Sequence, residues 1–365
     1  MGNHEDAFQG RLPWLGGPVG SDGKTMSNNQ ITNKKREISL DLIKILACLG
    51  VVAIHTIYPS KSFVNRIVTL LAVTSIPLFF MVNGYLMFRR ETLDYKYMLK
   101  KILRILGVCL AWEFLHAVVY LLYYRQPRNF LSSFVLDFFQ QGLFFHFWYM
   151  GALILLYLTM PLLYKLFKKA PNVYAVVLTT LIIICAGIDL ASILVKRQFI
   201  LAVPQNLRYW TWLLYAMAGG YVAFNGKLVQ WFYTLTGYTK ILLVCLMLLF
   251  ASAWQFWFGT EVFGSIVIEA FYGSFPVLLA TASVFLICRN IHFSKKNVVT
   301  YLSGLTMGIY IMHPFVLAVL VKFVPAFTQG GALMNVAFWT LTTLICAVGT
   351  AIGKKIPIVN QLLRL

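Results

Sequence analysis

Long apolar runs separated by short polar stretches fill the chain from Ile38 onward. Each run holds about 17–25 residues, the length that an α-helix needs to cross a lipid bilayer. The runs predict ten transmembrane helices, with the approximate ranges Ile38–Tyr58, Ile67–Phe88, Ile102–Tyr124, Phe147–Phe167, Val173–Val195, Tyr209–Phe224, Ile241–Phe258, Ile266–Cys288, Val298–Phe323 and Leu333–Ile352. The predicted fold is therefore all-α, a polytopic membrane helix bundle with about ten transmembrane helices.

Polar segments flank this bundle. Residues 1–37 are polar, rich in glycine and asparagine, and contain no apolar core of a signal peptide, so we expect a disordered cytoplasmic N-terminal tail. Residues 353–365 are expected to form a short cytoplasmic C-terminal tail. Residues 38–352 then make one transmembrane domain, and any activity is expected in its helices and short loops.

The composition excludes a soluble protein. Hydrophobic residues make up 59% of the 365-residue chain and charged residues only 12%, whereas soluble domains carry about 25% charged residues. The six cysteines each stand alone within apolar runs, and no CxxC motif or His/Cys cluster occurs. Neither a disulfide framework nor a metal site is therefore expected.

The net charge of +19 indicates topology. Twenty Lys and Arg residues fall on one side of the predicted helices and eight on the other. Because cytoplasmic loops of membrane proteins collect positive charge, both termini are predicted to be cytoplasmic. No nucleic-acid-binding motif accompanies the charge, so no nucleic acid is expected as a partner.

Ionisable residues inside the apolar runs are the first candidates for chemistry, because a charge in hydrocarbon is costly and usually faces a cavity. They are Asp41, Lys44, His55, Glu113, His116, Asp189, Glu269 and His313. On the first helix, Lys44 and His55 are eleven residues apart and share one face, about 16 Å apart along the axis. Asp41 and Lys44 form either an interfacial ion pair or part of a catalytic site, and His55 is either a packed imidazole or a general base.

Basic residues gather between the second and third runs. Arg89 and Arg90 are followed by Lys100, Lys101 and Arg104, and the last three lie at positions i, i+1 and i+4 of a helix. This spacing directs two or three cations at a shared point, a shape suited to phosphate or pyrophosphate. The charge bias of cytoplasmic loops alone also accounts for basic residues here.

Other polar positions leave two interpretations open. Asn83-Gly84, near the end of the second run, either lets a backbone approach a ligand or marks a kink or close helix packing. Glu113 and His116 are three residues apart, and form either a structural clasp or a proton relay.

Two further segments carry imidazoles. Phe145-His146-Phe147-Trp148 opens the fourth run at an interface where aromatic residues are common. Thr306, Tyr310 and His313 are four and three residues apart, so they form one polar ridge on an otherwise apolar helix.

In order along the chain, these motifs resemble those of the acyltransferase type 3 family of integral-membrane enzymes, over about residues 38–352. The five motifs are Asp41-x-x-Lys44 followed by ten residues and His55; Phe79-Phe80-x-x-Asn83-Gly84-Tyr85-Leu86; Lys101 with Arg104; Phe145-His146-x-Trp148-Tyr149 with Tyr157 and Pro161; and Thr306-x-Gly308-Ile309-Tyr310-x-x-His313. Two positions depart from the family's usual pattern: Lys44 stands where arginine is usual, and Asn83 where serine is usual.

The resemblance implies transfer of an acyl group, commonly acetyl from cytoplasmic acetyl-CoA, to a sugar or related acceptor at the membrane. This chain looks most like the stand-alone bacterial enzymes that O-acetylate O-antigen or other surface polysaccharide, and is expected in the bacterial inner (plasma) membrane. The expected partners are acetyl-CoA as donor, a membrane-associated glycan as acceptor and the lipid bilayer, with no metal.

The expected roles follow from these motifs. The candidate residues are His55, Asp41, Lys44 and Glu113 for catalysis, Lys101, Arg104, Arg89 and Arg90 for the donor, and Asn83, His146, Trp148, Tyr310 and His313 for the acceptor. His55 would act as the base or carry the acyl group briefly. The rival interpretation is a transporter or flippase for a lipid-linked saccharide or small solute, with Glu113, Asp189 and Glu269 as a coupling relay and with symmetry between two halves, which the sequence does not show.

Overall fold

The computed structural model describes residues 36–58, 62–127, 129–291 and 296–363, and within these ranges the secondary structure is helical with no strand. The helices are α1 (Ile38–Thr56), α2 (Phe63–Ala72), α3 (Ser75–Phe88), α4 (Tyr95–Tyr124), α5 (Phe130–Asp137), α6 (Trp148–Lys169), α7 (Pro171–Val195), α8 (Tyr209–Ala223), α9 (Lys227–Thr234), α10 (Gly237–Trp257), α11 (Phe275–Arg289), α12 (Lys296–Ser303), α13 (Thr306–Phe323), α14 (Ala326–Gln329), α15 (Ala332–Gly353) and α16 (Pro357–Leu362). Short 3-10 turns lie at η2 (Phe145–Phe147), η3 (Phe199–Ala202), η4 (Gln205–Leu207) and η6 (Ile268–Ala270), and a π turn, η5 (Phe258–Val262), follows α10.

Eight helical segments in the described ranges are long and apolar enough to cross a membrane. They are Ile38–Thr56, Phe63–Phe88, Tyr95–Tyr124, Phe145–Lys169, Pro171–Val195, Gly237–Val262, Thr306–Phe323 and Ala332–Gly353. The sixth and eighth predicted spans correspond to α8 and α11, which have 15 residues each. Such a helix rises about 22 Å, less than the hydrocarbon core of about 30 Å. The polytopic helical bundle is confirmed, and the expected ten full spans are corrected to eight with two short helices.

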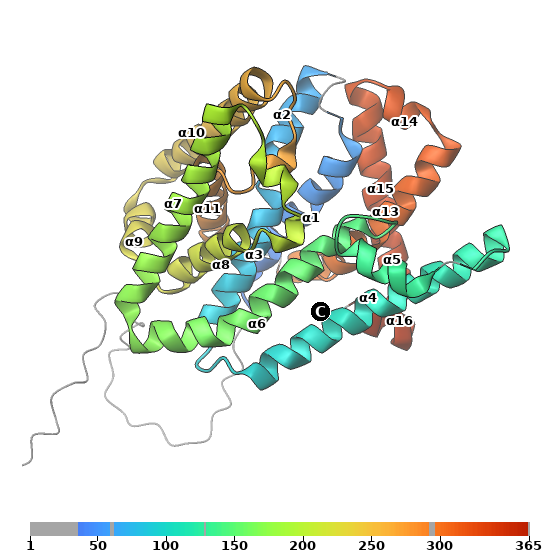
Figure 1. The fold of residues 1–365 in the computed structure, drawn as a ribbon, viewed down its shortest axis with the longest axis horizontal. Coiled ribbons are helices and arrows are strands. Elements are labelled where there is room, and N and C mark those ends of the chain that lie inside the picture. The colour runs from blue at the N-terminus through green and yellow to red at the C-terminus, as the bar shows by residue number, and fades with distance from the viewer. Residues whose placement is uncertain (1–35, 59–61, 128, 292–295, 364–365) are drawn as a thin grey trace, which may run out of the picture.

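Helices α1 and α3 lie in the middle of the bundle, between the group α7–α11 on one side and α13–α15 on the other (Figure 1). Helix α3 packs along α8, and α1 packs against α3, α12, α13 and α15. The long helix α4 runs along one edge beside α5 and α6. This arrangement leaves α1, α3, α4, α6 and α13 around a common interior.

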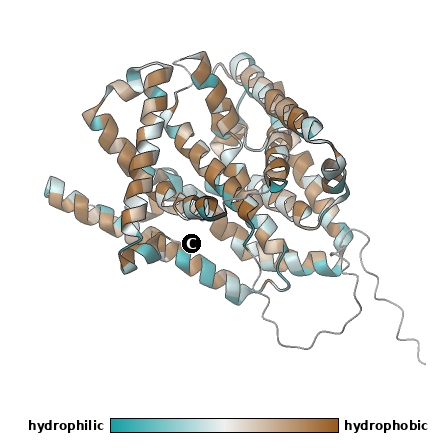
Figure 2. Ribbon diagram, turned by 180° about the vertical axis from the view of Figure 1, so that it is seen from behind, coloured by the Kyte–Doolittle hydropathy of each residue, from teal (hydrophilic) through white to brown (hydrophobic). Residues whose placement is uncertain are grey.

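The outward faces of the peripheral helices are apolar. Buried residues make up only 17% of the apolar window of α7 and 22% of the windows of α4, α10 and α15, so most of their apolar side chains face outward. Figure 2 shows hydrophobic residues along most of the helices and hydrophilic ones in the first part of α4. A surface of this kind matches a lipid environment.

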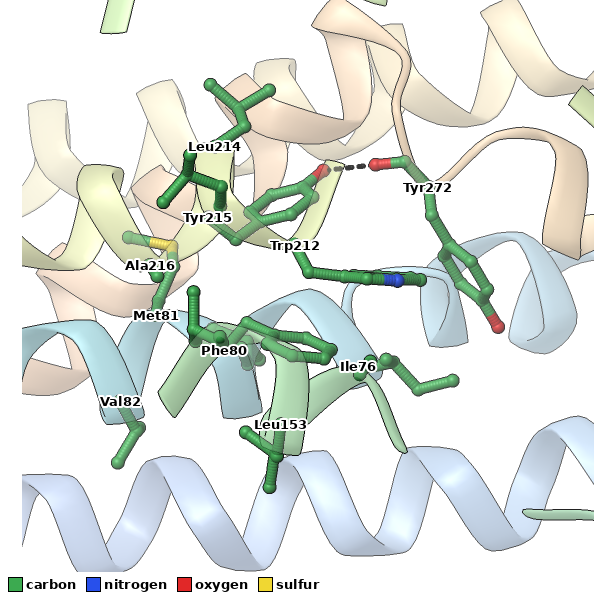
Figure 3. Close-up of a cluster of buried hydrophobic side chains, with 14 of the residues drawn as sticks. Ile76, Phe80, Met81, Val82, Leu153, Trp212, Leu214, Tyr215, Ala216 and Tyr272 are labelled. Atoms are coloured by element: carbon green, nitrogen blue, oxygen red, sulfur yellow. Dashed lines mark hydrogen bonds between the residues drawn. The ribbon is translucent and has the colours of Figure 1, made fainter. Parts of the chain in front are cut away.

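Close backbone contact joins α3 to α8. A Cβ atom on Gly84 would lie 1.8 Å from the carbonyl oxygen of Ala216, and one on Gly219 would lie 2.0 Å from that of Met81. Beside this crossing, the ring of Phe80 stacks on Trp212 at 4.6 Å, as Figure 3 shows. Of the two interpretations of Asn83-Gly84, the structure therefore supports close helix packing for the glycine.

A pair of buried asparagines fixes the end of α1 that carries His55. The Nδ2 of Asn65 donates to the Oδ1 of Asn335 at 2.6 Å, and the backbone nitrogen of Tyr58 donates to the same oxygen at 3.1 Å. Asn335 lies on α15 and Asn65 on α2. These contacts hold the chain just after His55 against two other helices.

The predicted tails carry structure at their inner ends. Residues 1–35 of the predicted N-terminal tail lie outside the described residues, but Arg36 and Glu37 are described and form ion pairs. The C-terminal segment contains α16, and the indole nitrogen of Trp112 on α4 donates to the carbonyl of Leu362 at 3.5 Å. Both segments thus border the interior between α1 and α4.

Candidate active site

Two adjoining cavities of about 960 and 800 Å³ lie in this interior. They share six lining residues, Arg36, Lys44, Asn83, Leu86, Lys101 and Tyr157. We call the two cavities together the cation chamber, because the described residues of its walls include Arg36, Lys44, Arg89, Arg90, Lys101, Arg104, Arg289 and Lys354. Against these eight cations the described lining residues include three carboxylates, those of Glu37, Asp41 and Glu91.

All four residues expected to hold the donor line this chamber. Lys101 and Arg104 project into it from α4, and Arg89 and Arg90 follow the end of α3. Lys101 borders both cavities and lies within electrostatic range of Lys44, Arg90 and Arg104. The adjacent Lys100 is exposed and lines neither cavity. The α4 cations at positions i and i+3 therefore share one space with the basic residues after α3.

Asp41 has a different principal partner from the one expected. Its carboxylate accepts two hydrogen bonds from the guanidinium of Arg36, at 2.6 and 3.0 Å, and one from the hydroxyl of Ser303 at 2.8 Å. The ammonium of Lys44 lies 3.9 Å from the same carboxylate. Asp41 thus anchors Arg36 in a bidentate pair and holds Lys44 only at the limit of ion-pair distance. The hydrogen bond from Arg36 to Asp41 raises the pKa of this guanidinium, although burial opposes the effect.

Asn83 is held by two tyrosines of α6 at the wall common to both cavities. The hydroxyl of Tyr157 donates to Asn83 Oδ1 at 2.8 Å, and Asn83 Nδ2 donates to the hydroxyl of Tyr149 at 3.3 Å and to the carbonyl of Phe79 at 2.9 Å. A serine here would reach fewer partners, because it has one hydroxyl and no amide. The asparagine therefore links α3 to α6.

Three imidazoles from separate parts of the chain meet beside Tyr310, a lining residue of the smaller cavity, and none of the three lines either cavity itself. The rings of His55 on α1 and His313 on α13 are stacked at a centroid distance of 5.3 Å. The ring of His146 on η2 lies 5.0 Å from His313, and Phe145 contacts His55 edge-on at 5.1 Å. We call His55, His146 and His313 the imidazole cluster.

Hydrogen bonds determine the tautomer of His313. Its Nδ1 lies 2.7 Å from the carbonyl oxygen of Tyr310, and since a carbonyl only accepts, Nδ1 carries the proton. In the neutral ring Nε2 is then a bare acceptor, and it is buried without a partner in the described structure. Both ring nitrogens of His146 are likewise buried without a partner. A buried polar atom without a partner costs about 1–3 kcal/mol, so each of these three ring nitrogens would gain from a hydrogen bond with a further group.

Tyr310 connects the imidazole cluster to the cation chamber. It lines the smaller cavity, and its hydroxyl donates to the backbone carbonyl of His146 at 2.5 Å. Its ring contacts that of His146 at 4.8 Å and that of Tyr149, another lining residue, at 5.7 Å. Tyr310 therefore lies between the smaller cavity and the imidazole cluster and contacts both.

Two expected site residues lie elsewhere. Trp148 is buried against Trp212 at 5.2 Å, in the core between α6 and α8, and does not line either cavity. Glu113 is fully buried on α4 and pairs with His116 at 3.3 Å. The ring of Phe144 lies between this pair and the imidazole cluster, 5.7 Å from His116 and 5.9 Å from His146.

The sequence interpretation missed three basic residues of the chamber. Arg36 was assigned to the disordered tail, and Arg289 and Lys354 were counted only as loop charges. All three immediately adjoin apolar helices, which is where positive charge accumulates in any membrane protein. No local pattern distinguishes Arg289 and Lys354, because both lie more than 180 positions from Lys101 and Arg104 in the sequence.

This chain is similar to a known protein family and to one curated protein. A family model described as "Acyltransferase domain" matches residues 37–353. A curated protein named "Amino-acid racemase" from Enterococcus faecalis is 31% identical over 144 residues, which cover 33% of this chain and 19% of that protein. The chain thus spans about a fifth of that relative's length. No solved structure matches.

The matched region begins one residue before α1 and ends at the last residue of α15, so it includes the imidazole cluster and every basic residue of the cation chamber except Arg36 and Lys354. Together with the eight apolar helices, this match shows that the chain is a membrane protein that belongs to the acyltransferase type 3 family.

Proposed function

We propose that this protein is an O-acetyltransferase that moves an acetyl group from cytoplasmic acetyl-CoA to a hydroxyl of a bacterial surface polysaccharide, O-antigen-like or lipid-linked. The observation that carries the proposal is the continuity of the site: a chamber walled by basic residues ends at a tyrosine that contacts two of three clustered imidazoles. Phosphate recognition and proton transfer are thereby combined in one interior.

The donor chemistry matches the walls of the chamber. Acetyl-CoA carries several phosphate charges at one end and a thioester at the other, so it needs cations along part of its length and an apolar passage along the rest. Lys101, Arg104, Arg89 and Arg90 supply the cations, and guanidinium groups suit phosphate because they bind two of its oxygens at once. The charge bias of the loops supports placing the chamber at the cytoplasmic end of the bundle, and the family supports placing the protein in the bacterial inner membrane.

The transfer step requires a base beside the thioester. In our proposal a neutral imidazole of His55 accepts the proton of the acceptor hydroxyl while the hydroxyl oxygen bonds to the acetyl carbon. The carbon–sulfur bond then breaks, and the leaving thiolate of the donor takes this proton from the His55 imidazolium. Brief acylation of His55 itself is the alternative route to the same products. Stacking on His313 would orient the His55 ring for either route.

The acceptor would enter against the remaining polar surfaces. Tyr310 and Asn83 line the chamber, and the buried ring nitrogens of His146 and His313 lie behind Tyr310, whose ring contacts both imidazoles. The hydroxyls of a sugar ring can hydrogen-bond to imidazole nitrogens and to the Asn83 amide, and the apolar faces of the ring can pack on aromatic side chains. Trp148 keeps a supporting position behind Tyr149, whose ring it contacts at 6.4 Å.

The function is tested by acetyl transfer in a defined membrane. The purified full chain is reconstituted in vesicles with membrane glycolipid and supplied with radiolabelled acetyl-CoA. Label is expected to appear in the glycolipid, and mass spectrometry of surface glycans from cells with and without the gene is expected to differ by whole acetyl units. Release of label without an acylated acceptor, or movement of an unmodified saccharide across the vesicle membrane, would contradict the proposal and favour the transporter.

Replacing Arg104 with alanine is expected to raise the KM for acetyl-CoA about tenfold or more, with a smaller change in kcat. The loss of one charge-assisted hydrogen bond of about 1.5–3 kcal/mol accounts for this size. Lys100→Ala is the matched control, because it removes the same charge from the same helix at a position outside the chamber. Equal KM values for the two variants would argue against a donor role for Arg104.

A further inference from the structure

One carboxylate of the cation chamber is surrounded by donors. Glu37, immediately before α1, forms ion pairs with both Arg89 and Arg289. Its Oε2 also accepts a hydrogen bond from the hydroxyl of Tyr85 at 3.1 Å. The three donors come from the end of α3 and the end of α11, so Glu37 occupies the point where three helices meet at the chamber wall.

The donors are held in place independently of Glu37. The guanidinium of Arg289 lies over the ring of Tyr85 at 4.7 Å and donates to the hydroxyl of Ser39 at 3.0 Å. The guanidinium of Arg89 lies over the same ring at 5.4 Å and donates to the Tyr85 hydroxyl at 3.1 Å. Burial and the positive charge of Arg289 both lower the pKa of Arg89. Two like charges are thus fixed around one anion position.

The chemistry of this position is that of a phosphate site. Two guanidinium groups and a hydroxyl converge on one acidic group, the donor set that proteins use for phosphomonoesters. Arg289 Nε is buried and has no hydrogen-bond partner in the described structure, so the set retains an unused donor. A carboxylate neutralises only one of the two positive charges, whereas a phosphomonoester dianion would neutralise both.

We propose that Arg89, Arg289 and Tyr85 form a phosphomonoester site that Glu37 fills in this structure, and that the terminal phosphate of the donor exchanges with the Glu37 carboxylate. The inference rests on the proposed function, since it assigns this phosphate to a nucleotide-bearing acyl donor. It adds a specificity: donors with a terminal phosphomonoester bind, and those without it leave Glu37 in place. Glu37 itself lies outside the helix, with an extended backbone, and its side chain is partly exposed.

The test measures binding of adenosine 3′,5′-bisphosphate, the terminal part of such a donor, to the purified full chain by calorimetry. Glu37→Gln removes the competing charge and is expected to tighten binding about tenfold. Glu91→Gln is the matched control, because it removes the same charge from a residue that lines the same cavity and contacts neither arginine in the described structure. Arg289→Gln is expected to weaken binding about tenfold. The comparison ligand is 3′-dephospho-coenzyme A, which carries a pyrophosphate diester but no phosphomonoester, and it is expected to bind all four proteins with similar affinity.

Equal gains in Glu37→Gln and Glu91→Gln would show a general effect of charge and overturn the proposal, as would weaker binding in Glu37→Gln. If Glu37→Gln does not remain monodisperse, Arg289→Lys supplies the second measurement. In that variant the wild-type preference for adenosine 3′,5′-bisphosphate over 3′-dephospho-coenzyme A must fall. Tighter binding of a short-chain phosphatidic acid than of the bisphosphate would assign the site to a lipid headgroup and overturn the donor assignment. If the wild type transfers acetyl groups but Glu37→Gln does not change the affinity for the bisphosphate, this inference alone is refuted. If Glu37→Gln tightens bisphosphate binding but the wild type transfers no acetyl group, the proposed function is refuted.

Discussion

Replacing His55 with alanine is expected to lower the rate of acetyl transfer by about 10²–10⁴, the contribution of a positioned general base. The ring lies between Phe145 and His313, beside the end of the cation chamber, where a thioester and a hydroxyl would meet. The protein is expected to accumulate normally, because His55 contributes ring contacts but no hydrogen bond among those the structure gives. Initial rates with labelled acetyl-CoA, set against the amount of protein in the membrane, measure the effect.

His116→Ala is the comparison for this variant. It removes an imidazole from another membrane-spanning helix, paired with Glu113 and separated from the cluster by Phe144. Its activity is expected to stay within a fewfold of the wild type. Full activity in His55→Ala together with its loss in His116→Ala would transfer the proton-relay role to the Glu113–His116 pair.

Replacing Gly84 with valine is expected to prevent stable folding. Even the Cβ atom would overlap the carbonyl of Ala216, so α3 and α8 must move apart by more than an ångström. Overpacking of a core costs about 1–3 kcal/mol when side chains can yield, and here the obstacle is backbone. The same movement would separate Phe80 from Trp212. It would also shift Asn83, the residue immediately before Gly84 on α3, away from α6. The amount of monodisperse protein in mild detergent and its thermal unfolding midpoint check the result.

Gly107→Ala supplies the control for the loss of glycine from a membrane helix. Gly107 lies on α4, and a Cβ atom there would have no neighbour within 4 Å. Alanine favours a helix over glycine by about 1 kcal/mol, so this variant is expected to be as stable as the wild type or slightly more so. Similar losses in both variants would mean that the crossing of α3 and α8 is not the cause.

The helical bundle could be predicted from the sequence because burial in lipid requires long uninterrupted apolar runs, and these are visible without any knowledge of packing. The number of helices long enough to cross the membrane was harder to predict from the sequence. Helix α8 covers nearly the whole of the sixth predicted span, Tyr209–Phe224, which was already short, whereas the eighth predicted span, Ile266–Cys288, contains the turn η6 before α11 begins at Phe275. Hydropathy averages over η6, because Ile268 and Ala270 are apolar and buried.

The sequence located some of the candidate site residues correctly and others not. Lys101 and Arg104 could be placed on one helix face from their spacing, and the structure confirms that both border one cavity. Trp148 shows the limit of this reasoning: its motif suggested the acceptor site, but its ring is buried against Trp212 because α6 turns that face toward α8. Its role in acceptor binding remains a prediction.

The sequence by itself determined that this chain spans a membrane as a helical bundle, which helix faces are basic, and which motifs it shares with a family of acyltransferases. Only the tertiary structure decided that His55, His146 and His313 meet, that Asp41 binds Arg36 more closely than Lys44, and that Glu37 lies between two arginines. The physical reason is that helix periodicity fixes neighbours three or four residues apart. The packing of distant helices depends instead on contacts such as that of Gly84 with Ala216, whose partners no local pattern identifies.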